Sequence, residues 1–511
     1  MERRSFKMEK EKFMAMANGS DIRGIAMEGL EYEVNLTDEN IRKIAKGFLS
    51  WLEENVSAKE DRYKIAIGYD GRLTGEGIKK SLTDIFLEAG IHVIDVGIST
   101  TPSLFMATQY SDYDADAGIE ITASHLPKEY NGLKFFTKEG GLDSKAIHYI
   151  LEKAYADDEL KALNDQSGEV IEKDLIKDYA ADLREKIKSG FTEENRTDQP
   201  LKGRHILVDA GNGSAGFFVE EILEKLGAKT TGSQFLESNG HFPNHIPNPD
   251  DKEAMESLRS AVLKNQADMG IIFDTDADRA AVMDGEGRSI NRNNLIALAA
   301  SIALEDGKGG VIVTNSPVSN HAIKFIEKIG GEVEPYVSGY KNVIDRSIAL
   351  NKKDVYSPLA IETSGHAAFK ENYFLDDGSY LIAKILIADA KAQLEGGSVF
   401  DLIDGLKEPL ETEELRFVID LKDYREYGLS VIDDLERMGK EEEDFEFVPE
   451  NKEGVRFNVR GQYGEGWFLV RMSLHEPKLV LQMENDQKDA IPVLKKTLLP
   501  FFKAYEELKD I

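Results

Sequence analysis

The chain has 511 residues, 41% of them hydrophobic and 9% aromatic, which at roughly 150 residues per domain predicts three or four globular domains. Its 63 Lys and Arg residues against 94 Asp and Glu residues give a net charge of −31, which disfavours nucleic acid and anionic membranes as partners. An anionic ligand would therefore need a local cluster of Arg, Lys or a metal ion. The absence of cysteine excludes disulfides, thiolate nucleophiles and Cys-ligated metals, and we expect a cytoplasmic protein.

No segment is predicted to cross a membrane. The longest apolar run, residues 295–304, is much shorter than the ~20 residues that a spanning helix needs. Residues 1–21 interleave Lys and Glu where a signal peptide would have a continuous apolar stretch. We interpret them as an exposed N-terminal helix or arm.

A strand–helix–strand unit occurs three times along the chain. In each copy a short β-branched run leads through a polar or glycine-containing turn into an amphipathic helix that ends at Gly90, Gly227 or Gly330, and a second strand follows. The predicted segments are 64–72, 86–90 and 91–97; 204–216, 222–227 and 228–232; and 310–316, 325–331 and 332–339.

A further strand follows each unit, with similar residues at 115–119 and 267–271 and a comparable segment at 357–366. Parallel strands joined by helices place ligand loops at the carboxyl ends of the strands, so each unit should offer one functional loop. After about residue 410 the strands 455–459, 466–473 and 478–485 lack intervening helices, and a closing helix follows at 487–508. This pattern predicts an antiparallel sheet in a smaller fourth domain, with the acidic stretch 439–454 as a solvated loop and strand edge. We place the domains at residues 1–165, 166–305, 306–408 and 409–511.

The first functional loop contains Ser124 and His125 in the sequence TASHLP, followed by Lys134. A hydrolase is disfavoured because adjacent side chains seldom contact each other and no G-x-S-x-G motif is present. Ser124 is either a phosphoryl carrier, with Lys134 holding its charge or moving a proton, or an ordinary turn residue.

The second loop, DTDADR, carries Asp274, Asp276 and Asp278 at alternate positions directly after an apolar strand. Three carboxylates can converge on one hard cation, and oxygen ligands favour Mg²⁺. An EF-hand is excluded because Arg279 and Gly285 stand where that loop requires Gly and Glu. Arg279 adds a positive charge suited to an anionic ligand.

The remaining loops carry weaker signals. Glu362, Ser364 and His366 lie in the sequence ETSGH, which could bind sugar hydroxyls or form an ordinary polar turn. Lys341 could add a cation beside it, or be a solvated surface lysine. Arg471 and Ser473, in the sequence RMSLHEP, could form a phosphate nest, or a hairpin with an exposed arginine.

Residues 211–216 match G-x-G-x-x-G, with Glu237 further on, as in a dinucleotide-binding site. An NAD-dependent oxidoreductase is therefore the alternative function. The other two units lack this glycine spacing and the run KTTGSQF is a poor buried strand, so we interpret these glycines as packing residues.

Together the loops resemble those of the α-D-phosphohexomutase family, from Gly19–Gly24 (GSDIRG) to the Arg471 loop and in the family's order. The resemblance implies an α/β fold with three related domains with mixed sheets, and a smaller, divergent α+β domain, around a central cleft. It also implies a phosphoglucomutase or phosphomannomutase that interconverts hexose 1- and 6-phosphates through a phosphoserine and a hexose 1,6-bisphosphate. The partner would be a sugar phosphate, and the chain a monomer or homodimer.

The resemblance assigns roles residue by residue. The catalytic residues would be Ser124, Lys134, Arg279 and His366, and Mg²⁺ would be held by Ser124, Asp274, Asp276 and Asp278. The substrate would be bound by Arg23, Lys341, Glu362, Ser364, His366, Arg471 and Ser473. The sequence departs from the family's pattern at Leu474 and His475, so phosphate contacts are not implied there. A non-catalytic sugar-phosphate binding protein would not need both Ser124 and the clustered Asp residues.

The preferred hexose is not fixed by these motifs. Gly339, Tyr340 and Lys341 resemble the phosphoglucomutase version of that loop, whereas ETSGH resembles phosphomannomutase-like members. Dual specificity for glucose and mannose phosphates is consistent with both.

Overall fold

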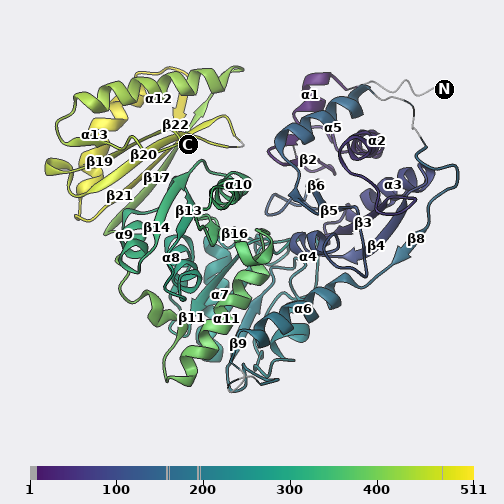
Figure 1. Cartoon of the computed structure of the whole chain (residues 1–511). Coiled ribbons are helices and arrows are strands. Elements are labelled where there is room, and N and C mark those ends of the chain that lie inside the picture. Colours follow the sequence, from purple (N-terminus) through teal and green to yellow (C-terminus); the bar gives the residue numbers. More distant parts are fainter. Residues whose placement is uncertain are drawn as a thin grey trace. The chain divides into compact units, whose positions relative to one another are not determined.

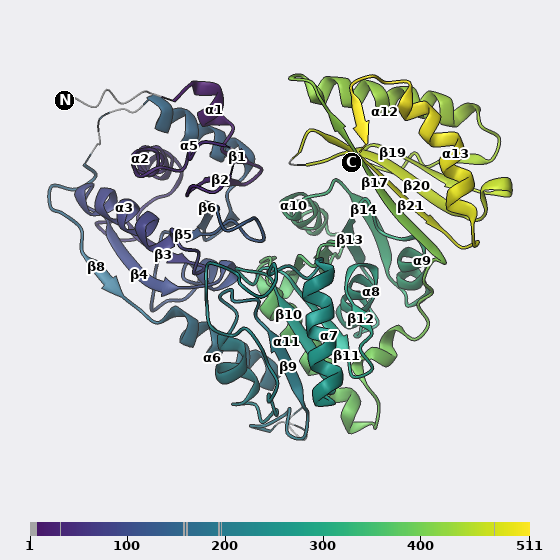
Figure 2. The ribbon, with the colours of Figure 1, turned by 180° about the vertical axis from the view of Figure 1, so that it is seen from behind.

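The computed structural model describes residues 8–30, 32–156, 159, 162–192, 195, 197–474 and 476–510. The chain forms two compact units, one of Met1–Leu295 with Ser364–Asp401 and the other of Ile296–Thr363 with Leu402–Ile511 (Figure 1). Figure 2 shows the same ribbon from behind.

The first unit begins with a mixed sheet of order β1-β2-β6-β5-β3-β4-β8, to which β7 adds beside β6. Its central strand β3 is parallel to both β4 and β5, whereas β6 is antiparallel to β5 and β2. The strands are β1 Ala17–Asn18, β2 Asp21–Ile25, β3 Lys64–Tyr69, β4 His92–Ile98, β5 Ala117–Ile121, β6 Tyr130–Thr137, β7 Gly140–Gly141 and β8 Val170–Glu172. The helices are α1 Lys10–Met14, α2 Asp38–Asn55, α3 Gly75–Glu88, α4 Thr101–Met106 and α5 Ser144–Ala156.

Helices cover both faces of this sheet, and two adjacent phenylalanines of β6 show why. Successive residues of a strand point to opposite faces. The ring of Phe135 stacks on that of Phe48 of α2, with the ring centroids 4.8 Å apart, in a core shared with α3 and α5. Phe136 instead packs edge-on against Phe105 of α4, with the ring centroids 6.1 Å apart. The sheet is therefore buried on both faces, and a ligand can reach it only at the loops that connect its strands.

The first unit contains a second sheet of order β12-β11-β10-β9, in which β9 Ile206–Asp209 is parallel to β10 Met269–Phe273. β11 Ala280–Asp284 returns antiparallel to β10, and β12 is Ser289–Ile290. The loop between β10 and β11 carries Asp274, Asp276 and Asp278. The other elements are α6 Leu175–Ser189, the π-helix η1 Phe218–Leu223, α7 Lys252–Asn265, β16 Ala367–Phe369, η2 Lys370–Asn372 and α11 Gly378–Leu394.

The second unit contains parallel strands in which β13 Val311–Asn315 lies between β14 Glu332–Tyr336 and β15 Leu359–Ile361. Helices α9 Asn320–Lys328 and α10 Tyr340–Asn351 connect them, and α8 Arg292–Ala303 and η3 Val399–Ile403 lie at the unit boundaries. A six-stranded antiparallel sheet of order β18-β19-β20-β21-β17-β22 follows, packed against α12 and α13. Its elements are β17 Glu411–Ile419, α12 Tyr424–Glu441, β18 Phe445–Phe447, β19 Val455–Val459, η4 Gly461–Tyr463, β20 Gly466–Met472, β21 Lys478–Asn485, α13 Ala490–Lys503 and β22 Leu508–Asp510.

The predicted fold class is confirmed, with three α/β parts that have mixed sheets and a β-rich C-terminal part. The first and third repeats form as predicted, and Gly90, Gly227 and Gly330 all have a left-handed backbone, with φ of 85°, 93° and 93°. In the second repeat the predicted strand 228–232 is wrong. Within this segment Lys229 forms an isolated bridge with His205, and Gly232 turns the backbone to φ 103°.

The prediction of an exposed N-terminal helix or arm is confirmed in part for the residues that the structure describes, since residues 9–12 are exposed. Helix α1 forms, but Phe13 and Met16 are buried in the core of the first sheet. Residues 1–7 lie outside the described residues. Helix α12, which extends into the predicted acidic loop at 439–454, was not predicted from the sequence.

We predict that Gly47→Ala destabilises the first unit. A glycine inside a helix normally costs about 1 kcal/mol relative to alanine, but a Cβ at Gly47 would lie 2.2 Å from the carbonyl oxygen of Ile150. Separating α2 from α5 should cost roughly 1–3 kcal/mol, measured by urea denaturation. Gly77→Ala in α3 is the control, because nothing lies within 4 Å of its Cβ, and it should stabilise by about 0.5–1 kcal/mol. Equal effects of the two substitutions would contradict this account of the helix pair.

Candidate active site

Ser124 lies in a tight loop after β5, held in a conformation that few side chains adopt. Its φ is 51°, in the left-handed region. Its backbone N–H donates to Thr122 Oγ1 at 2.8 Å, and Thr122 Oγ1 donates to Asp70 Oδ2 at 2.7 Å. Such strain persists only where surrounding contacts enforce it, and it is common at functional sites.

Arg72 is the residue that enforces this loop, and sequence reasoning missed it. Its guanidinium is buried and donates to the carbonyl oxygens of Ser124 at 2.5 Å and Leu126 at 2.6 Å, and to those of Pro127 and Tyr130 at 2.8 and 2.9 Å. Burial raises the pKa of its partner Asp70 to about 6, although Arg72 opposes the rise. The signal in the sequence was Asp-Gly-Arg at the carboxyl end of a buried strand, the place where ligand loops are expected.

The three aspartates of the second loop converge as predicted. Asp274, Asp276 and Asp278 are buried and offer carboxylate oxygens within 4.8 Å of one another. Lys134 Nζ lies 2.9 Å from Asp276 Oδ2 and 2.5 Å from Asp278 Oδ2. The Oδ1 atoms of Asp276 and Asp278 are buried without a hydrogen-bond partner among the described residues. Buried anionic oxygens without partners are costly, so this donor set fits a hard cation such as Mg²⁺.

Ser124 is joined to this cluster. Its Oγ donates to Asp274 Oδ2 at 3.0 Å and accepts from Arg279 Nη2 at 3.2 Å. Arg279 Nε also donates to Asp274 Oδ2, at 3.0 Å. Burial and the neighbouring Asp278 raise the pKa of Asp274 well above its usual range. The hydroxyl, a carboxylate and a guanidinium from two distant segments therefore meet at one point.

His125 contacts Ser124, contrary to the expectation for adjacent residues: Ser124 Oγ lies 3.3 Å from its Nδ1. The same Nδ1 lies 2.7 Å from Arg279 Nη2 and accepts a hydrogen bond from it. The charge of Arg279 and burial lower the pKa of His125 well below its usual value. The ring is thus a poor base, and the hydrolase interpretation gains nothing from this contact.

His366 reaches the same cluster from the loop before β16. Its backbone bridges to that of Arg279, and its Nδ1 lies 2.5 Å from Asp376 Oδ2 and 3.9 Å from Asp278 Oδ1. Burial opposes the charged form, but Asp376 and Asp278 outweigh it and raise the pKa of His366 to about 9. The imidazolium form is therefore favoured at neutral pH. Asp376, which orients the ring, was missed because it lies ten residues further along the chain.

Arg23 also lies beside the Ser124 loop. It extends from β2, where it pairs with Gly132 of β6. Its Nη2 donates to Asp21 Oδ2 at 2.8 Å, and its Nη1 lies 3.5 Å from the carbonyl oxygen of Ala123. The structure therefore brings Arg23 together with Ser124, Lys134, Arg279, His366 and the three aspartates in the first unit.

Of the other predicted residues, Lys341, Glu362, Arg471 and Ser473 lie in the second unit. Glu362 Oε1 accepts from the backbone N–H of Gly339 at 2.7 Å, and Lys341 pairs with Asp345 on its own helix. Ser364 belongs to the first unit. In the hairpin after β20, the backbone N–H of Ser473 donates to the carbonyl oxygen of Lys478 at 2.8 Å.

Glu453 connects the loop at Ser338 and Gly339 to Arg471, and sequence reasoning also missed it. It accepts from the backbone N–H of Ser338 at 3.1 Å and from Ser338 Oγ at 2.6 Å, and its Oε1 lies 3.8 Å from Arg471 Nη1. Arg471 therefore faces an internal carboxylate beside the Gly339 loop. Leu474 is 36% exposed, whereas His475 lies outside the described residues.

The glycines at 211–216 pack against the metal loop. A Cβ at Gly213 would lie 2.5 Å from the carbonyl oxygen of Thr275, and Ser214 donates to the same oxygen at 2.8 Å from its N–H and 3.0 Å from its Oγ. Gly216 approaches the backbone of Leu236 in the same way. These contacts give the glycines a packing role, as the sequence interpretation proposed.

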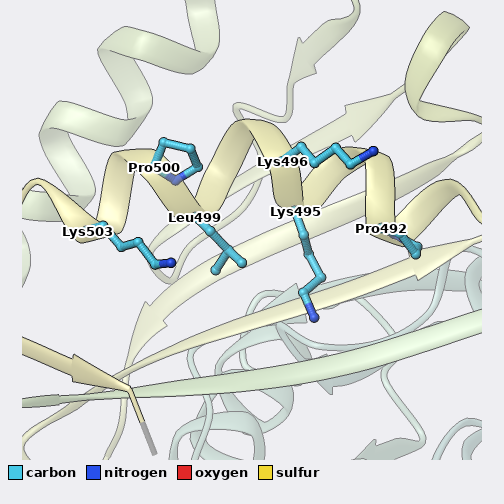
Figure 3. Close-up of a pocket in the computed structure, with 6 residues that line it drawn as sticks. All are labelled: Pro492, Lys495, Lys496, Leu499, Pro500 and Lys503. Carbon is cyan, nitrogen blue, oxygen red and sulfur yellow. The ribbon is translucent and has the colours of Figure 1, made fainter.

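Two hollows in the second unit share no residue with these clusters. One, of about 470 Å³, runs along α13 and is lined only by that helix (Figure 3). Its lining residues are Pro492, Lys495, Lys496, Leu499, Pro500 and Lys503. The other, of about 600 Å³, includes His321, Trp467 and Glu484. Neither contains the convergent hydroxyl, carboxylates and guanidinium that surround Ser124.

The α/β domains and this site define a class of enzyme. The sequence matches "Phosphoglucomutase/phosphomannomutase, alpha/beta/alpha domain I" at residues 15–161, domain II at 177–287 and domain III at 291–407. The chain belongs to the phosphoglucomutase/phosphomannomutase family, and the oxidoreductase alternative has no support.

Known proteins resemble the chain over most of its length. It is 30% identical to a Pseudomonas syringae pv. tomato phosphomannomutase/phosphoglucomutase, over 91% of this chain and 90% of that one. It is also 30% identical to a Neisseria gonorrhoeae phosphoglucomutase, over 92% and 93% of the two chains. A crystal structure of a phosphoglucomutase/phosphomannomutase family protein from Burkholderia thailandensis superposes with a TM-score of 0.77 at 26% identity, covering 96% and 97% of the chains. No helix among the described residues is long and apolar enough to span a membrane.

We predict that Arg72→Lys loosens the Ser124 loop. A lysine is a point charge and cannot donate to four carbonyl oxygens at once. Leaving buried carbonyls without donors should cost roughly 1–3 kcal/mol, and amide exchange over residues 122–130 should accelerate. Arg62→Lys is the control, because Arg62 donates to the carbonyls of Gln166 and Ser167 at an exposed site. Unchanged exchange in Arg72→Lys would contradict the role given to this arginine.

Proposed function

We propose that this phosphohexomutase interconverts hexose 1-phosphate and hexose 6-phosphate, with Ser124 as the phosphoryl carrier. The observation that carries the proposal is the position of Ser124 Oγ, 3.0 Å from Asp274 Oδ2 and 3.2 Å from Arg279 Nη2 in a buried cluster. A nucleophilic hydroxyl beside a fixed cation suits phosphoryl transfer, where positioning and charge neutralisation supply most of the catalysis.

Asp274, Asp276 and Asp278, with Ser124, are the residues that would hold Mg²⁺. Their support is the set of buried carboxylate oxygens described above, two of which have no hydrogen-bond partner among the described residues. When bound, the ion would neutralise charge on the transferring phosphoryl group. Arg279, whose Nη2 lies 3.2 Å from Ser124 Oγ, would bind the same group.

In the transfer step a bond forms between the sugar hydroxyl oxygen and phosphorus while the bond between phosphorus and Ser124 Oγ breaks. The hydroxyl proton ends on Ser124 Oγ, and we assign its relay to Lys134. His366, whose pKa of about 9 keeps it protonated at neutral pH, would donate a hydrogen bond to the phosphoryl oxygens. The resulting hexose 1,6-bisphosphate must reorient in the site before it returns its other phosphate to Ser124.

This reorientation requires contacts that hold the sugar and its second phosphate. We assign these to Arg23, Lys341, Glu362, Ser364, His366, Arg471 and Ser473. Glucose and mannose phosphates are the proposed substrates, with the bisphosphate as activator, in a cytoplasmic monomer or homodimer. A coupled assay across hexose 1-phosphates measures the preference directly.

We predict that Ser124 acquires phosphate when the protein is incubated with glucose 1,6-bisphosphate and Mg²⁺. Intact-mass and peptide analysis should find one phosphoryl group on Ser124 and none in Ser124→Ala, which should lose nearly all mutase activity. Ser50→Ala is the control, because Ser50 Oγ donates a hydrogen bond to the carbonyl oxygen of Lys46 in its own helix. Near-normal turnover by Ser124→Ala would refute the phosphoserine mechanism.

We predict that Arg471→Ala weakens productive binding about ten- to a hundredfold, because a charge-assisted hydrogen bond is worth roughly 1.5–3 kcal/mol. Phosphorylation of Ser124 should be less affected than turnover, and more free bisphosphate should be released per cycle. Arg416→Ala is the control, since Arg416 is half exposed and pairs with Glu414 and Glu476 at the surface. An unchanged KM without added dependence on bisphosphate would make the Arg471 loop a plain hairpin.

A further inference from the structure

A threonine that none of the loop motifs includes makes two contacts with the aspartate loop. Thr101 is the first residue of α4, directly after β4, and is 3% exposed. Its backbone N–H donates to the carbonyl oxygen of Asp276 at 3.0 Å, and its Oγ1 donates to Asp276 Oδ2. The two residues are 175 positions apart in the sequence.

These contacts make the two carboxylate oxygens of Asp276 unequal. Oδ2 accepts hydrogen bonds from Thr101 Oγ1 and from Lys134 Nζ. Oδ1 is equally buried and has no hydrogen-bond partner among the described residues. Thr101 therefore fixes both the backbone of Asp276 and the rotation of its carboxylate, and it leaves one defined oxygen available to a cation.

The turn that carries Thr101 is itself firmly held. Thr100 and Ser103 form a reciprocal capping box, with Ser103 N–H to Thr100 Oγ1 at 3.2 Å and Thr100 N–H to Ser103 Oγ at 3.0 Å. Ser99 Oγ donates to the buried carboxyl of Glu120 at 2.6 Å. A Cβ at Gly68 would lie 1.9 Å from Ser99 Oγ, so only glycine leaves room for this contact.

We propose that Thr101 is a positioning residue for the Mg²⁺ site, which orients Asp276 so that Oδ1 faces the ion. This inference rests on the proposed function, because it takes Asp276 as a metal ligand. Groups that orient metal ligands by hydrogen bonds typically change metal affinity ten- to a hundredfold when they are replaced. A threonine that only joined two loops would contribute to stability without changing metal affinity.

The test is Mg²⁺ binding to the full-length, dephosphorylated protein by isothermal titration calorimetry. Thr101→Val keeps the side-chain shape without the hydroxyl and should bind Mg²⁺ roughly ten- to a hundredfold more weakly than wild type. Thr101→Ser and Thr101→Ala both lose the methyl group and differ only in the hydroxyl. Thr101→Ser should bind Mg²⁺ with wild-type affinity, and Thr101→Ala should bind it as weakly as Thr101→Val. This pair tests the hydroxyl even if Thr101→Val fails to fold.

Thr108→Val is the matched control, because Thr108 is buried just after the same helix and its Oγ1 contacts the carbonyls of Phe105 and Thr137. It should leave Mg²⁺ affinity unchanged. Urea denaturation in Mg²⁺-free buffer measures stability separately. Loss of stability with wild-type Mg²⁺ affinity in Thr101→Val and Thr101→Ala would overturn the inference while leaving the proposed function intact. Absence of Mg²⁺ binding by the wild type would overturn both.

Discussion

Three carboxylates buried at the end of one strand impose the main physical constraint on this structure. Asp274, Asp276 and Asp278 would repel one another in a low-dielectric interior unless cations compensate them. Arg279 supplies one charge from the same loop, and Lys134 supplies another from β6 of the neighbouring sheet. The acidic loop therefore forms only where two α/β parts of the first unit meet, and Ser124 lies at that same point.

This constraint explains why a chain with a net charge of −31 can bind an anionic sugar phosphate. The attraction must be local, because the overall field repels the ligand. Arg23, Arg279 and His366 gather around Ser124, while Arg72 is used inside the loop to hold its backbone. The cations thus divide into Arg72, which holds the loop, and those that would meet a phosphoryl group under the proposed function.

The sequence predicts the parts of the site that lie in continuous motifs. Alternating aspartates after a buried strand, and a Ser-containing loop after another, are local patterns that correspond to local structure. Gly90 and Gly330 likewise follow the ends of their helices with the left-handed backbone that their positions indicated.

Contacts between distant segments could not be predicted in this way. Asp376 orients His366 from beyond β16, Arg72 holds carbonyls more than 50 positions away, and Glu453 reaches Ser338 from the bend before β19. The second repeat also differs from the first and third repeats, because η1 is a π-helix and Gly232 interrupts the strand predicted after that helix. Periodicity cannot reveal pairings that depend on which loops meet in space.

The most direct test of this account is a crystal structure of the protein with Mn²⁺ in place of Mg²⁺, located by anomalous scattering. The account predicts one strong peak coordinated by Asp274, Asp276 through Oδ1, Asp278 and the Ser124 side chain, with six oxygen ligands or fewer in a compact shell. Metal bound elsewhere, or no metal between the three aspartates at saturating Mn²⁺, would contradict it.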